Sequence, residues 1–221
     1  MADNYVNPLG YTPDPEKTRT TLKPEATYED RLMAAWTRIM FWLIIPTALA
    51  GIMTYEGVLQ LFPVLNIPGM ILGAASNLAY GYVMMRLKPV NKQYYTAGIC
   101  TLIAGGINLI IAGNSAISPH WALMITVTTH FVTFIGQYNE MSAHDTTLIE
   151  KHYELSEKWA NLKKWYMITF LVYVGSLMLM LLIPTLGAAL ALISSMGMIA
   201  VSVFKLIYLY RTYNVFKEIT A

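Results

Sequence analysis

Long stretches without a single charged side chain constrain this sequence more than any other feature. Asp, Glu, Lys and Arg are all absent from residues 57–85, 93–139 and 165–204, and only 13% of the chain is charged, against roughly a quarter in soluble domains. A charge at the centre of a bilayer costs roughly 2.5–3.5 kcal/mol, and a helix needs about 20 mostly apolar residues to cross the hydrocarbon. The pattern therefore predicts a protein built from membrane-spanning helices.

The apolar segments predict an all-α, polytopic membrane protein with six transmembrane helices. Pro68 and Pro119 suit the first turn of a helix, whereas Pro46 inside the first span predicts a kink. Residues 1–28 are expected to form a polar cytoplasmic tail, and residues 29–221 the six-helix transmembrane bundle. The expected spans are about 33–55, 67–85, 95–112, 120–138, 165–183 and 185–210.

The basic residues predict how these spans are oriented. All 15 lie in the tail, beside the first span, between spans two and three, between spans four and five, or near the C-terminus, and none lies in 56–66, 113–119 or 184–186. Because Lys and Arg concentrate on the cytoplasmic side, both termini are expected there. We expect a bacterial cytoplasmic membrane, with an organellar inner membrane as the alternative. The bilayer is then the first partner, and a net charge of +2 is too small to indicate nucleic acid.

Small residues predict where the helices touch. In the second span Gly69, Gly73, Asn77 and Gly81 follow one another every four residues and share one face. Such ladders let membrane helices approach closely. Asn77, together with Asn108 of the third span, has two interpretations. We favour hydrogen bonds across the bundle, and the alternative is that both amides line a solute site.

The fourth span has the most informative polar pattern. His130, Gln137, Glu140 and His144 lie on one face of a helix, and no proline interrupts the chain from 120 to 165. This predicts one continuous helix, in which residues 139–164 form a long cytoplasmic extension. Past His144 the same face continues through a largely apolar seam, formed by Leu148, His152, Leu155, Trp159 and Leu162.

This long face also has two interpretations. One is packing, in which the seam is an interface with the N-terminal lead helix or with a second copy of the chain. The other is a polar ligand-binding site near the cytoplasmic face, because an imidazole within a bilayer is a functional hypothesis by default. The candidate ligand-binding residues are His130, Gln137, Glu140, His144, Asn77 and Asn108.

No motif identifies a reaction, a metal or a cofactor. Glu140 and His144 could supply two ligands, but Asp145 points about 100° away on a helix, and two ligands from one helix do not make a tetrahedral site. Neither a metal nor a cofactor is expected, and no catalytic residue is assigned. We therefore expect a non-enzymatic membrane protein that acts as an oligomeric or accessory subunit of a complex. The alternative is a small-solute transporter or channel with a polar site on the fourth helix.

Overall fold

The computed structural model describes residues 26–54, 56–113, 118–180 and 182–221. Within these ranges the chain consists of helices and short connections, without a strand. The all-α prediction is therefore confirmed. The elements are α1 (Tyr28–Met53), α2 (Glu56–Leu61), the 3-10 helix η1 (Pro63–Leu65), α3 (Asn66–Arg86), α4 (Lys92–Gly113), α5 (Pro119–Leu148), α6 (Tyr153–Met180) and α7 (Pro184–Thr220).

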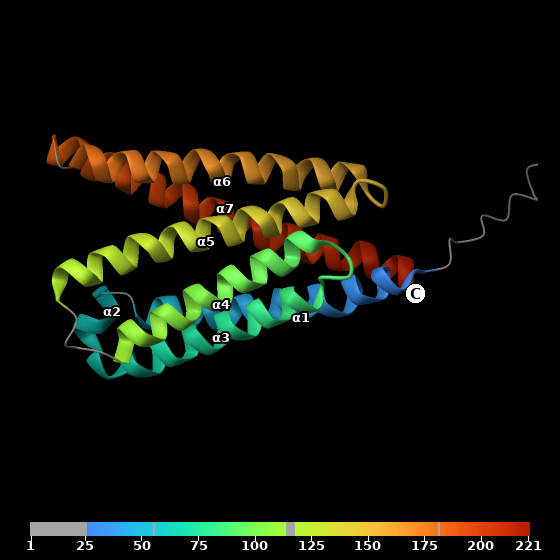
Figure 1. Ribbon diagram of the computed structural model, residues 1–221, viewed down its shortest axis with the longest axis horizontal. Coiled ribbons are helices and arrows are strands. Elements are labelled where there is room, and N and C mark those ends of the chain that lie inside the picture. The colour runs from blue at the N-terminus through green and yellow to red at the C-terminus, as the bar shows by residue number, and fades with distance from the viewer. Residues whose placement is uncertain (1–25, 55, 114–117, 181) are drawn as a thin grey trace, which may run out of the picture.

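The six long helices form a bundle in which chain neighbours are also neighbours in space. α1 packs against α3, and the contacts continue in chain order through α4, α5 and α6 to α7, which packs against α1 and closes the ring. Figure 1 shows that the α3–α4 and α5–α6 connections lie at the same end of the elongated bundle as the C-terminus. We call this the basic end and the opposite end, which carries α2, the far end. The predicted helical bundle is confirmed.

Two of the described helices, α1 and α7, are long and apolar enough to cross a membrane, judged by length and composition. Only 17% of the most apolar window in each helix is buried inside the bundle. Most of their apolar surface therefore faces outward. This suggests contact with a membrane, while the count of six spans stays a prediction.

The glycine ladder of α3 lies at helix contacts, as its spacing indicates. A Cβ atom added at Gly69 would lie 2.8 Å from the Cβ of Met53 on α1. On the next helix pair, a Cβ at Gly81 would lie 2.9 Å from the carbonyl oxygen of Gly98 on α4. Both distances are too short for a real side chain, so α3 owes its close approach to both neighbours to these glycines.

The predicted continuous helix through residues 139–164 is wrong. α5 ends at Leu148 and α6 begins at Tyr153, so the chain reverses and the two helices pack against each other. The start of α6 is capped by His152, whose Nδ1 accepts a hydrogen bond from the Leu155 N–H at 3.2 Å. Histidine is not among the residues that usually cap a helix. The segment between the two helices, residues 149–152, therefore contains no proline, glycine or common capping residue that would indicate the turn.

Asp145 of α5 holds the two helices of this turn together through contacts with α6. The Ser156 hydroxyl donates to both the main-chain carbonyl and the carboxylate of Asp145, each at 2.9 Å. The Lys163 ammonium forms an ion pair with the same carboxylate at 3.0 Å. These contacts join α5 to the first turns of α6, so the two helices form a hairpin at the basic end.

Large side chains fill the interior at the basic end. Trp159, Tyr94 and Phe216 come from α6, α4 and α7 and are at most 1% exposed. Met33 and Met40 of α1 complete this core and are fully buried. The helices of the ring are thus held together most firmly at the end where the two hairpin connections lie.

Candidate functional site

A buried ion pair lies inside the bundle, between α5 and α7. The Lys205 ammonium is 2.8 Å from Glu140 Oε2, and the side chain of Glu140 is fully buried. Lys205 also donates a hydrogen bond to Gln137 Oε1 at 2.7 Å. The Tyr80 hydroxyl of α3 donates to the other carboxylate oxygen of Glu140. We call these four residues the charged cluster.

The charged cluster satisfies its own hydrogen-bonding needs. Besides its two hydrogen bonds, the Lys205 ammonium faces the ring of Tyr80, with Nζ 5.1 Å from the ring centre. Both carboxylate oxygens of Glu140 accept a hydrogen bond. This matters because burying a charge without a partner costs several kcal/mol, and the penalty is offset only when geometry and additional hydrogen bonds are good. Opposite charges therefore join α5 to α7, and a hydrogen bond joins α3 to α5 at the same point.

His144 lies one turn beyond Glu140 toward the basic end and is enclosed by aromatic rings. Its Nδ1 is hydrogen-bonded to the Tyr94 hydroxyl at 2.8 Å, and its ring stacks on Trp159 with the centroids 4.4 Å apart. Burial, together with the nearby charge of Lys205, lowers the pKa of His144 to about 3. The imidazole is therefore neutral at physiological pH. Its Nε2 atom is buried and has no hydrogen-bond partner among the described residues.

A cavity of about 390 Å³ lies between α1, α3 and α4, nearer the far end. Asn77 and Asn108 both line it, together with Thr47 and Thr54 of α1. No hydrogen bond joins either amide to another side chain in the described part of the protein, so the favoured interpretation of bonds across the bundle is not what the structure has. Asn108 is exposed, whereas Asn77 is half-buried. We call this space the far cavity.

The far cavity ends next to the charged cluster. Asn77 and Tyr80 are three residues apart on α3 and share a face, which places them about 4.5 Å apart along the helix axis. On α1 the residues that follow the cavity toward the basic end, Met40 and Thr37, are fully buried. Buried side chains of α1 thus lie between the far cavity and the basic end.

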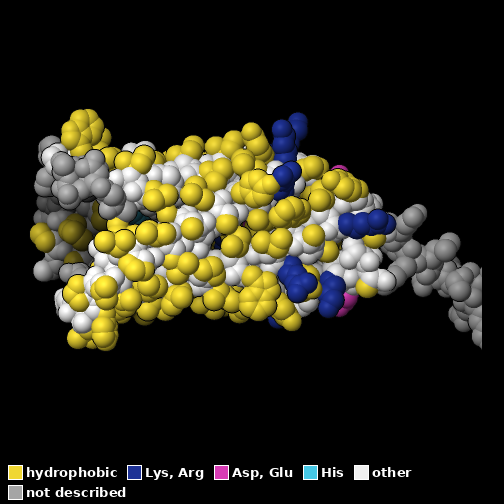
Figure 2. All heavy atoms as spheres, turned by 90° about the horizontal axis from the view of Figure 1, so that it is seen from below, with side chains coloured by type: hydrophobic (Ala, Val, Ile, Leu, Met, Phe, Trp, Pro, Cys, Tyr) yellow, Lys and Arg dark blue, Asp and Glu magenta, His cyan; other side chains and the backbone are white. Residues whose placement is uncertain are grey.

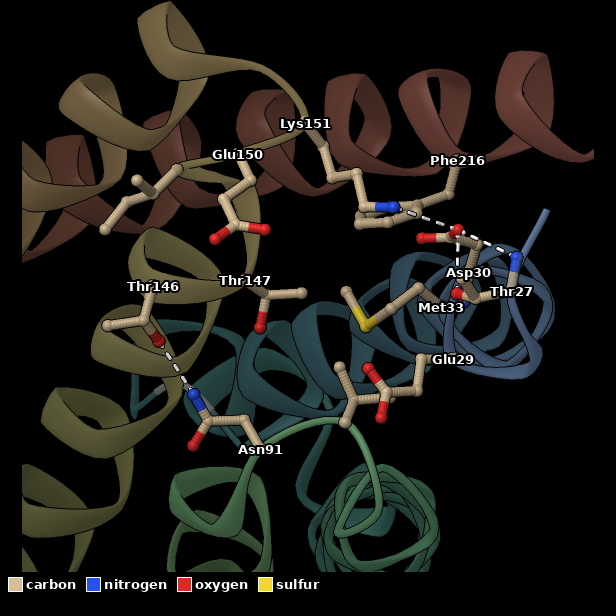
Figure 3. A pocket seen from close by; sticks show the side chains of 12 residues that line it. Thr27, Glu29, Asp30, Met33, Asn91, Thr146, Thr147, Glu150, Lys151 and Phe216 are labelled. Atoms are coloured by element: carbon tan, nitrogen blue, oxygen red, sulfur yellow. Dashed lines mark hydrogen bonds and ion pairs between the residues drawn. The ribbon is translucent and has the colours of Figure 1, made fainter. Parts of the chain in front are cut away.

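A second pocket, of about 490 Å³, opens at the basic end. Figure 3 shows two contacts between residues that line this pocket: the ion pair of Lys151 with Asp30, and the hydrogen bond from Asn91 to Thr146. Burial raises the pKa of Asp30, but hydrogen bonds from Thr27 and the contact with Lys151 outweigh it and the pKa is lowered. We call this space the basic-end pocket.

The structure brings together only part of the predicted ligand-binding set. Gln137, Glu140 and His144 face the interior as one group, as their spacing on one helix face indicates. His130 is exposed and stacks on Tyr173 of α6, with the ring centroids 5.9 Å apart. It therefore lies outside the charged cluster, as do the two asparagines of the far cavity.

The predicted interface seam packs within the chain, in one hydrophobic cluster with Met33 of the N-terminal lead helix, as one of the two packing alternatives expected. Leu148, Leu155, Trp159 and Leu162 are at most 5% exposed and belong to the hydrophobic core. The indole of Trp159 donates a hydrogen bond to Thr212 of α7 at 3.1 Å. His152, the fifth seam residue, is exposed in the turn between α5 and α6. Because the chain reverses at this turn, its own helices cover the apolar face that the continuous helix would have offered to a partner.

Sequence reasoning missed three residues of the site. Lys205 had a visible signal, because it is the only charged residue between Lys164 and Arg211. A lysine this close to the end of a span can extend to the membrane surface, but the Lys205 ammonium points into the bundle. Tyr80 and Tyr94 carried no signal, because tyrosines near span ends are ordinary interface residues.

The described residues contain no group of three or more His, Cys, Asp or Glu side chains that could hold a metal ion. Glu140 is already engaged by Lys205 and Tyr80. What the site can bind must therefore be inferred from its charges, its amides and its cavities. No protein-family model, curated protein or solved structure matches this chain.

Proposed function

We propose that the chain is a six-span integral membrane protein that carries a small polar solute through the interior of its helix ring. Outward-facing apolar side chains on helices other than α1 and α7 support six spans, among them Ile71 of α3, Ile110 of α4, Met124 of α5 and Met178 of α6, all at least 59% exposed. Exposed apolar surface of this extent suits lipid rather than water. Figure 2 shows the hydrophobic side chains along most of the visible face.

The basic side chains support an orientation with both termini on the cytoplasmic side. On the face shown in Figure 2, Lys and Arg gather toward one end of the molecule. The α3–α4 and α5–α6 connections, which carry Lys88 and Lys151, lie at that basic end together with the C-terminus. By the positive-inside rule this end faces the cytoplasm. We place the protein in a bacterial cytoplasmic membrane or an organellar inner membrane.

One observation carries the solute proposal: two cavities lie on opposite sides of a buried charged cluster. The far cavity is lined mostly by small and apolar residues, and its polar groups are hydroxyls and amides without a formal charge. The basic-end pocket opens on the proposed cytoplasmic side. Between them stand Tyr80, Glu140 and Lys205. Polar groups that are costly in a membrane are commonly those that mark a solute pathway.

In this proposal the charged cluster is the barrier, and its hydrogen bonds are what a solute must replace. A solute with hydrogen-bonding groups would exchange contacts with Asn77 for contacts with Tyr80 and Lys205. In the structure Met40 and Thr37 of α1 are fully buried between the far cavity and the basic end. Passage would therefore require the helices that the cluster joins to separate at this level.

The competing proposal, an accessory or oligomeric subunit, loses its main support. It rested on an apolar seam that a partner would cover, and four of the five seam residues are buried by the chain itself. Oligomerisation through other surfaces is compatible with both proposals. We therefore rank the solute pathway first.

The test of the pathway is whether water reaches the far cavity in a membrane. In a Cys100→Ala background, Asn77→Cys is expected to react with a charged, membrane-impermeant thiol reagent added outside sealed vesicles. The matched control is Ile71→Cys on the outward face of the same helix, 59% exposed, which should face lipid and not react. Equal reaction of both positions, or of neither, would contradict a water-accessible pathway.

Two further cysteines check the topology separately. Val64→Cys lies at the far end and is 78% exposed, so it should react from outside. Lys88→Cys, in the α3–α4 connection, should react only after the vesicles are opened. If Lys88→Cys reacts in intact, correctly oriented vesicles, the proposed six-span topology is wrong, whatever the result at Asn77.

A further inference from the structure

A groove runs between α1 and α7 on the outside of the bundle, near the basic end. It has a volume of about 700 Å³ and is separate from the two interior spaces. Ala34 and Ala35 form part of its α1 wall, and their small side chains leave the space open. Farther along α1 the groove is lined by Ile39, Trp42 and Leu43.

Three basic side chains line the groove, and no acidic side chain does. They are Arg31 and Arg38 of α1 and Lys217 of α7. Arg31 and Arg38 are seven residues apart, so they lie on the same helix face about 10 Å from each other along the axis. Within the described part of the chain, no carboxylate forms an ion pair with any of the three. Their charge is therefore available to a ligand.

The polar and apolar parts of the groove are ordered along the membrane normal that we proposed above. Arg31 lies near the start of α1 and Lys217 near the end of α7, both at the basic end. Ile39, Trp42 and Leu43 follow two to three turns farther along α1, toward the far end. A ligand that fits this order has an anionic group at the cytoplasmic surface and an apolar part that extends into the bilayer.

We propose that the groove binds an anionic phospholipid from the cytoplasmic leaflet. The phosphate of the headgroup is held by Arg31, Arg38 and Lys217, and an acyl chain lies along Ile39, Trp42 and Leu43. Basic pockets between membrane helices on the cytoplasmic side are suited to such headgroups. Free phosphate is a poorer match, because the apolar half of the groove would remain uncovered. This inference rests on the proposed membrane insertion, but not on the solute pathway.

The test uses the full chain extracted in a mild neutral detergent, with phosphatidylglycerol or phosphatidylcholine added and bound lipid counted by native mass spectrometry. The wild-type chain is expected to retain one phosphatidylglycerol in preference to phosphatidylcholine. Substituting Arg31, Arg38 and Lys217 by Gln should weaken this binding on the order of 100-fold, since each basic residue near anionic lipid contributes about fivefold. The matched control substitutes Lys88, Lys92 and Lys164, three exposed basic residues outside the groove, by Gln and should bind like wild type.

A second variant tests the groove without changing any charge. Ala35→Phe places a ring in the space and should also displace phosphatidylglycerol, while circular dichroism confirms that the helices are retained. Equal loss in the control triple variant, unchanged binding in both groove variants, or full competition by equimolar inorganic phosphate would each overturn the proposal. A chain that is extracted only by detergent but has no preference for phosphatidylglycerol refutes this inference alone. A chain recovered without detergent refutes the proposed membrane function as well.

Discussion

The two ends of this bundle are built from the same helices but packed in different ways. At the basic end, inward positions are occupied by large side chains such as Trp159 and Tyr94, which are fully buried. At the far end, Thr47, Asn77 and Asn108 line a cavity. Protein interiors close only where side-chain volume fills the space between helices. The packed basic end therefore contributes most to stability, and the interior of the far end keeps a cavity in which a solute can bind.

The largest effect on stability is expected from breaking the ion pair of Lys205 with Glu140, which lies between the basic end and the far cavity. Lys205→Met leaves Glu140 buried without its cation, and we expect it to lower the free energy of unfolding by about 3–5 kcal/mol. The double variant Lys205→Met with Glu140→Leu should recover much of that loss, because two apolar groups need no partner. Thermal unfolding in detergent measures both.

The control for this prediction is Lys164→Met, which removes an exposed lysine of α6. A surface substitution of this kind usually changes stability by less than about 0.5 kcal/mol. Equal losses for Lys164→Met and Lys205→Met would show that the charged cluster contributes nothing specific. A double variant that is less stable than Lys205→Met alone would show that Glu140 has another partner after Lys205 is removed.

The ion pair also illustrates what the sequence can and cannot indicate. Helix positions followed from the uncharged windows, and Gln137, Glu140 and His144 were grouped correctly because helical spacing alone sets which residues share a face. The partner on α7 did not follow, because spacing within one helix contains no information on which other helix packs against it. Lys205, like Arg38 of the first span, was a basic residue inside an apolar segment for which two orientations were physically acceptable.

The turn after Leu148 was missed for a different reason. Its helix-ending signals are long-range contacts, such as the bonds from Ser156 and Lys163 to Asp145, and the uncommon cap at His152. None of these is visible as a proline, a glycine or a regular cap. Because the turn was not predicted, the apolar face was expected on a projecting helix, where the lead helix or a second copy would cover it. In the structure the turn folds this face into the hairpin core.

A medium effect is expected from pH, and it should arise at the basic end alone. The unfolded chain binds a proton at His144 near pH 6.5, whereas the folded chain does so only near pH 3. Protons therefore favour the unfolded chain, and stability is lost as pH falls below 6.5, by roughly 1.4 kcal/mol per pH unit. From pH 6.5 to 4.5 the loss should reach about 2.3 kcal/mol, because the unfolded imidazole is already half protonated at pH 6.5.

The pH dependence can be assigned to His144 by comparison with His152, which is exposed in the turn. His144→Phe should be less stable at pH 7.5 but nearly flat between pH 6.5 and 4.5, while His152→Gln should keep the wild-type slope. Unfolding midpoints in detergent across this range decide the matter. A wild-type slope in His144→Phe would mean that another group titrates, and the enclosed imidazole would not be the source.

The smallest effect is expected at the far end and concerns Asn77. Polar contacts between membrane helices average about 0.6 kcal/mol, and Asn77 has no hydrogen bond to a described side chain, so Asn77→Ala should cost at most about this much. For the same reason, the energies of Asn77→Ala and Asn108→Ala should add without coupling. Double-mutant thermal unfolding tests this, with Gly81→Ala as the contrast, because its added Cβ would meet the α4 backbone. Strong coupling between the two asparagines would instead mean that they bond across the bundle and that the far cavity closes in the membrane. Weak coupling, combined with thiol reactivity at position 77, would leave a polar cavity whose side chains contribute little to stability and are therefore free to bind a solute.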